Sequence, residues 1–121
     1  MTNDDSMSFA VEVARLADDS KCRDVVVLDV RGISSVTDVT IIATGTSERQ
    51  IRAVADYVIE YARKVGRRPY GFCGHENASW VVIDFVDVVL HIFDRKHREF
   101  YDLELLWGDA PQLSWARSES A

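Results

Sequence analysis

The sequence has little cysteine, and neither cysteine belongs to a known site spacing. Cys22 and Cys73 are the two cysteines among 121 residues, and they form no C-x-x-C pair and no zinc-ligand pattern. This excludes a disulfide-rich secreted scaffold and a dithiol redox motif, because both need cysteines at close, regular spacings. Two isolated thiols are typical of a reducing compartment, so we expect a cytoplasmic protein.

Long apolar runs are missing as well. No stretch approaches the roughly 20 apolar residues of a membrane span. The first five residues, Met1–Asp5, include two acids, whereas a signal peptide begins with a basic region followed by an apolar one. We therefore expect neither a signal peptide nor contact with a membrane.

Positive charge is scarce: 14 Lys and Arg residues face 20 Asp and Glu residues, a net charge of -6. Duplex nucleic acid is an unfavourable partner, because affinity for phosphate comes mainly from cations that displace counterions. An acidic surface suits a basic partner protein, although mild acidity also serves solubility alone. Four cations cluster after residue 62, where they either complement a helix dipole or touch an RNA backbone: Arg63, Lys64, Arg67 and Arg68.

The length and the 47% apolar content predict one globular domain with its own core. We expect a disordered N-terminus at 1–7, a folded domain at 8–108 and a flexible C-terminal tail at 109–121. Trp115 is an apolar residue that this tail does not explain.

The periodicity of apolar residues predicts the elements. A first helix follows the spacing from Phe9 to Ala17, and a last helix covers about 96–107 with Phe100, Leu103 and Trp107 inward. Strands are predicted at 25–28 (a central strand covered on both faces), 39–44, 70–73 (a short edge strand), 80–85 and 88–93. This order predicts an α/β fold: a single domain with a mixed β-sheet and helices mainly on one face.

The clearest local signal is a long helix after the strand at 39–44. Ser47 and Gln50 form a capping box, apolar residues recur at helical spacing from Ile51 to Val65, and Gly66 follows as a C-terminal cap. The free N–H groups after Thr44 could instead bind an anion, but the lysine and glycines of a phosphate-binding loop are absent.

Enzymatic alternatives rest on scattered side chains. Asp29, Asp38, Asp84 and Asp87 lie near strand ends and could hold Mg²⁺ for a nucleotidyltransferase-like reaction. Cys73 and His75 have no assignable orienting carboxylate beyond Glu76 for nucleophilic catalysis, and the histidines and cysteines show no zinc spacing. We expect no catalytic, cofactor or metal site and no small-molecule substrate.

A binding surface is easier to assemble from the two strands at 80–85 and 88–93. Alternation places Trp80, Val82 and Asp84 on one face of the first strand. The same rule groups residues of the second: Asp87, Val89, His91 and Phe93. Aromatic and acidic side chains together are typical of an interface with a basic partner. Alternatively, Trp80 and Phe93 simply pack under a helix.

Several segments together resemble the ribosome silencing factor family, also called Iojap-like. They are Asp24–Val30, Thr37-Asp38, Ile41–Gln50, Gly71 with Gly74, Trp80, Asp84, Asp87–Phe93 and Arg98–Trp107. The resemblance covers about 8–107. It implies a nucleotidyltransferase-like topology without the active site of those enzymes.

The resemblance also implies a function. Members bind ribosomal protein L-fourteen of the large subunit, exclude the small subunit sterically and repress translation; organellar relatives act in large-subunit assembly. Some members are homodimers when free. The contact surface expected here comprises Trp80, Asp84, Asp87, His91 and Phe93, extended by Glu104, Leu105 and Trp107.

Two departures from the family pattern bear on docking. Cys73 and His75 stand where the family usually has acidic residues, which removes two negative charges beside the expected surface. Val86 replaces the glycine that usually precedes the hairpin aspartate, which stiffens the turn.

Overall fold

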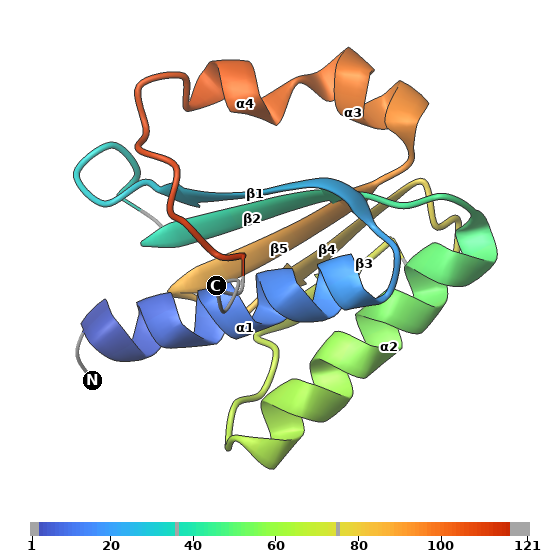
Figure 1. Ribbon diagram of the computed structural model, residues 1–121, viewed down its shortest axis with the longest axis horizontal. Coiled ribbons are helices and arrows are strands. Elements are labelled where there is room, and N and C mark those ends of the chain that lie inside the picture. Colours follow the sequence, from blue (N-terminus) through green and yellow to red (C-terminus); the bar gives the residue numbers. More distant parts are fainter. Residues whose placement is uncertain (1–2, 36, 75, 117–121) are drawn as a thin grey trace, which may run out of the picture.

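The computed structural model describes residues 3–35, 37–74 and 76–116. It contains a five-stranded sheet in the order β1-β2-β5-β4-β3 (Figure 1). The strands are β1 (Arg23–Asp29), β2 (Val39–Thr44), β3 (Gly71–Cys73), β4 (Trp80–Asp84) and β5 (Val88–Phe93). β2 and β5 run parallel and the other neighbours pair antiparallel, so the predicted mixed sheet is confirmed.

Two helices of 17 residues each, α1 (Asn3–Asp19) and α2 (Glu48–Lys64), cover one face of the sheet. Two short helices, α3 (Arg95–Tyr101) and α4 (Leu103–Leu106), lie over the other face (Figure 1). The prediction of helices mainly on one face therefore holds, although the second face is partly covered as well. We call the face under α1 and α2 the first face and the other the second face.

Each face has its own core. Strand residues alternate between them, so Val27, Ile41 and Leu90 pack under the long helices, whereas Leu28, Ile42 and Phe93 point to the second face. The core of the first face is mostly aliphatic and includes the apolar stripe of α2. The core of the second face is smaller, and partly buried Trp80, Leu103 and Trp107 pack against it.

The caps of α2 largely match those that the sequence predicts. The Ser47 hydroxyl accepts a hydrogen bond from the Gln50 N–H at 3.0 Å, and Gly66 adopts a left-handed conformation just after the helix. The side chain of Gln50 accepts from the N–H of Thr46 rather than of Ser47, at 2.9 Å. The second half of the capping box thus lies one residue earlier than the motif predicts.

The two ends of the domain correct the predicted boundaries. Helix α1 begins at Asn3, within the segment 1–7 expected to be disordered, and the Ser6 hydroxyl donates to the carboxylate of Asp87. The segment expected to be a flexible tail lies along β1: Pro111 accepts from the Asp29 N–H at 2.9 Å, and the Leu113 N–H donates to Val27 at 2.8 Å. These hydrogen bonds cover the free edge of β1, which is an edge strand and not the predicted central one.

Trp115 explains why the tail folds back. It packs against the core of the first face, and its indole N–H donates to the carbonyl of Val25 at 3.0 Å. The Arg15 guanidinium of α1 donates to the Trp115 carbonyl at 2.7 Å. The apolar outlier of the sequence is therefore part of the core.

The predicted last helix is broken in two. Asp102 adopts a left-handed conformation with φ 48°, which ends α3 and starts α4. The break moves Phe100 outward, where its side chain is 78% exposed, and so corrects the prediction that it faces inward. Leu103 and Trp107 do pack toward the sheet.

Candidate docking site

The second face carries most of the side chains that the sequence singled out. In the β4–β5 register Trp80 lies opposite Phe93, Val82 opposite His91, and Asp84 opposite Val89. Cys73 of the edge strand β3 pairs with Val82, so it joins the same face. The alternation predicted for these two strands is confirmed for the strand residues, but Asp87, which was grouped with them, precedes β5 and lies toward the first face.

Trp80 is half-buried among aromatic rings. Its ring stacks on Phe93 at 4.9 Å between centroids and contacts Tyr101 of α3 at 4.4 Å. Its indole N–H donates to Nδ1 of His91 at 3.1 Å. The alternative that Trp80 and Phe93 pack under a helix is thus correct for Phe93, which is fully buried, and correct in part for Trp80.

His91 is nearly buried beneath this cluster, with 9% of its surface exposed. Burial lowers the pKa of His91 from 6.5 to about 4, and nearby Asp84 opposes this only weakly. The imidazole is therefore neutral at pH 7. Because an indole N–H can only donate, Nδ1 is the unprotonated nitrogen and Nε2 carries the proton.

Asp84 lies at the end of β4, where it supports the hairpin turn. Its carboxylate accepts from the Val86 N–H at 2.7 Å, and Val86 has a φ of 76°. A β-branched residue is strained in this left-handed region. Phe85, Val86 and Asp87 lie between β4 and β5, one residue more than the predicted two, and the Asp84 side chain stabilises the turn while staying partly exposed.

Two predicted contact residues lie outside the accessible part of the second face. Phe93 has no exposed surface, because Trp80 and the helix layer cover it. Asp87 leaves the hairpin toward the first face, where Arg67 of the segment after α2 donates to it at 2.9 Å. Burial raises the pKa of Asp87, but the hydrogen bonds from Arg67 and Ser6 outweigh this, so its pKa lies below the usual value. Asp87 thus links the hairpin to α1 and to the segment after α2.

The helices of the second face supply the exposed part of the site. Leu105 is 77% exposed and Tyr101 is 45% exposed, beside partly buried Glu104 and Trp107. We define the docking surface as six accessible residues of this face: Trp80, Asp84, Tyr101, Glu104, Leu105 and Trp107.

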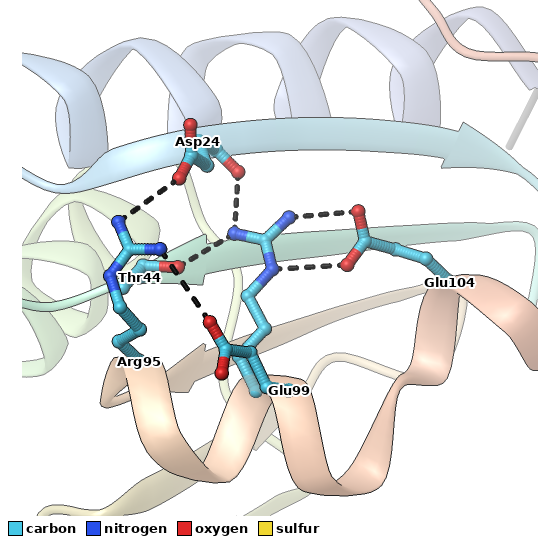
Figure 2. Close-up of polar contacts among 6 residues, drawn as sticks. Asp24, Thr44, Arg95, Glu99 and Glu104 are labelled. Atoms are coloured by element: carbon cyan, nitrogen blue, oxygen red, sulfur yellow. Dashed lines mark hydrogen bonds and ion pairs between the residues drawn. The ribbon is translucent and has the colours of Figure 1, made fainter.

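A polar network fixes these helices to the sheet. The Arg98 guanidinium donates twice to Glu104, at 3.0 Å each, across the helix break. It also donates to the Thr44 hydroxyl at 2.8 Å and to the Asp24 carbonyl at 2.6 Å. Asp24 has φ 50° at a register shift in β1, where its carbonyl is turned toward α3. Figure 2 shows Asp24, Thr44 and Glu104 directed toward this one centre, with Arg95 and Glu99 at its outer side.

Three of the four carboxylates of the enzymatic alternative have separate partners, whereas the backbone N–H of the fourth, Asp38, donates to the Asp87 carbonyl at 3.0 Å. Asp29 pairs with Arg31 at 2.6 Å, Asp84 caps the turn, and Asp87 binds Arg67. The hydrogen bond from Arg31 lowers the pKa of Asp29. Among the described residues, no group of three or more His, Cys, Asp or Glu side chains is placed to hold a metal ion. His75 lies outside the described residues.

No described helix is long and apolar enough to cross a bilayer. The fold and the surface define a single α/β domain with a partly covered sheet face that displays aromatic, aliphatic and acidic side chains. The chain belongs to the family described as "Ribosomal silencing factor during starvation", whose model matches residues 3–121.

Relatives and solved structures agree with this membership. The chain is 40% identical over 113 residues to the ribosomal silencing factor RsfS of Halalkalibacterium halodurans, covering 93% of this chain and 94% of that protein. It is 47% identical over 91 residues to the Haemophilus influenzae protein of the same name, which covers 75% of this chain and 89% of that one. A crystal structure of a Chromobacterium violaceum protein superposes with a TM-score of 0.80 at 34% identity, covering 98% of this chain and 95% of the other. The resemblance noted in the sequence is confirmed.

Sequence reasoning missed two residues of the site. The sequence marks Tyr101 only as part of the family motif, because on one continuous helix it would lie about 120° away from the face of Trp107. Arg98 has no sequence signal beyond that motif, because its partners Asp24 and Thr44 are 74 and 54 residues away.

Proposed function

We propose that this protein docks on the large ribosomal subunit through ribosomal protein L-fourteen, keeps the small subunit away by occupying its place, and so represses translation in the cytoplasm without any chemical step. Membership of a family named for ribosomal silencing supports the regulatory role. The contact itself is proposed from the docking surface.

The observation that carries the proposal is the position of Trp80. Its ring is half-buried and fixed by neighbours, yet part of it stays accessible on the strand face that also carries Asp84, four residues further along β4. A rigid aromatic residue loses little conformational entropy on binding, which is why such residues dominate interface energies. Asp84 supplies negative charge that attracts a basic partner, whereas the charge of Glu104 is paired with Arg98.

The test compares variants on the two layers. Trp80→Ala and Asp84→Lys change the docking surface, whereas Tyr57→Ala on α2 and Asp18→Lys on α1 make matched changes at exposed positions of the opposite layer. Truncation of a central interface tryptophan costs about 2–4 kcal/mol, or roughly 30- to 1,000-fold in affinity. We expect the first pair to lose co-sedimentation with large subunits and the second pair to keep it.

Light scattering of purified subunits then tests the consequence. An excess of the protein should prevent association of large and small subunits, and Trp80→Ala should restore it. Normal association with the unchanged protein would contradict silencing; migration with precursor particles in sucrose gradients would indicate an assembly factor instead. Calorimetry with nucleoside triphosphates and Mg²⁺ should give no heat of binding, and turnover would favour the enzymatic alternative.

A further inference from the structure

The hydrogen bond between Trp80 and His91 joins diagonal neighbours on β4 and β5. Val82, not Trp80, is the register partner of His91, so the indole must lean along the sheet to reach Nδ1 at 3.1 Å. The two ring centroids are 6.0 Å apart. This is a directional contact, whereas Trp80 meets Phe93 by stacking and Tyr101 by a tilted ring contact.

Stacking and hydrogen bonding restrain different degrees of freedom. Rings at 4.9 and 4.4 Å fix the plane of the indole, but they leave open which edge points along the sheet. The indole has one N–H donor, so its hydrogen bond to Nδ1 of His91 determines which edge of the ring points along the sheet. His91 is itself held by burial between the strands and by contact with Trp107 at 6.5 Å between centroids.

We propose that His91 is a positioning residue of the docking surface: its Nδ1 holds the indole of Trp80 in the one orientation that the partner meets. This rests on the proposed docking through Trp80. Because the indole N–H is used internally, Trp80 offers the partner only ring surface. The partner group opposite it is then an aliphatic side chain or the stem and charge of a lysine or arginine, not a hydrogen-bond acceptor.

The inference is tested with two substitutions of His91. His91→Asn keeps an acceptor, since the Asn Oδ1 lies where Nδ1 was, and His91→Leu keeps the bulk without the acceptor. Losing one neutral hydrogen bond and the orientation it selects should lower affinity for large subunits about tenfold in His91→Leu. His91→Asn should stay within about threefold of the unchanged protein.

Spectroscopy separates positioning from a general loss of structure. The indole N–H signal of Trp80, assigned by its disappearance in Trp80→Phe, should be shifted and protected from exchange in the unchanged protein and in His91→Asn. It should lose both features in His91→Leu. In the Trp80→Phe background, which lacks the donor, His91→Leu should cost no further affinity.

Three results would overturn the proposal: equal affinities of His91→Leu and the unchanged protein, equal losses in His91→Leu and His91→Asn, or a nitrogen spectrum of the unchanged protein showing the proton on Nδ1. The nitrogen spectrum is recorded on the unchanged protein, so this test does not depend on whether a variant folds. If Trp80→Ala also bound normally, the docking surface itself would be wrong. If Trp80→Ala failed while His91→Leu bound fully, docking would stand and the positioning role would fall.

Discussion

The two faces of the sheet are held together by different kinds of interaction. Under α1 and α2 the core is continuous and mostly aliphatic, and each long helix buries a full stripe of side chains. On the second face, α3 and α4 span seven and four residues and contain no fully buried residue. Their position depends on Arg98, on the break at Asp102 and on aromatic contacts.

This contrast shows how one small domain separates stability from recognition. Hydrophobic burial is non-directional and grows with area, so the first face supplies most of the folding free energy. The second face buries less and keeps aromatic and acidic groups accessible. Its few directional contacts fix the shape of the docking surface and add little to the folding free energy.

The largest expected effect is a truncation in the first core. Leu90 is fully buried there, and Leu90→Ala should lower the free energy of unfolding by about 3 kcal/mol. Leu103→Ala, in the partly buried layer of α4, should cost about 1 kcal/mol. Denaturant unfolding measures both, and equal losses would remove the distinction between the faces.

Acid should weaken the protein through the second face. Burial lowers the pKa of His91 in the folded protein to about 4, whereas its ordinary value is 6.5. Between these two pH values the unfolded chain binds a proton on this imidazole and the folded protein does not. Stability is therefore complete above pH 6.5 and falls as the pH drops toward 4, by about 3 kcal/mol in full. His91→Asn should flatten this part of the stability curve. Asp29 and Asp87, whose pKa values are lowered from 3.8, affect stability only at lower pH.

Removal of the Arg98 side chain should loosen the second face selectively. Arg98→Ala leaves the Asp24 carbonyl and Glu104 without their charged donor, at a cost of about 2 kcal/mol. Hydrogen exchange should show lost protection in α3 and α4 and preserved protection in α2. Arg95→Ala is the matched control, because that side chain is 62% exposed and should matter little.

The smallest expected effect concerns the hairpin turn between β4 and β5. Val86→Gly relieves a β-branched residue at φ 76° and should raise the free energy of unfolding by about 0.5–1 kcal/mol. Val89→Gly, in the middle of the neighbouring strand, should instead destabilise. A thermal unfolding midpoint that does not rise in Val86→Gly would show that the turn is not strained.

The sequence predicts those parts of the fold that repeat along the chain. The stripe of α2, the strand at 39–44 and the alternation on β4 and β5 are confirmed, as is the Ser47 half of the capping box. Trp80 was placed on the right face for the same reason.

The parts that failed depend on distant partners. Nothing next to Asp87 in the sequence indicates Arg67 and Ser6, which turn its carboxylate away from the docking surface. The helix break at Asp102 sits within a pattern that suits one continuous helix and is stabilised from Arg98 across it. Alternation places Phe93 on the correct face of the sheet. It does not predict that a later helix, α3, packs over that residue.

The return of the chain along β1 has a consequence for how copies of this protein behave together. An uncovered sheet margin offers unpaired N–H and C=O groups to any other strand, and β1 carries aliphatic side chains on both sides. Residues 111–113 satisfy that margin from within the chain, which leaves the three-residue β3 as the open margin of the described sheet. A chain truncated after residue 110 would expose the unpaired edge of β1. It should aggregate at concentrations where the intact chain does not.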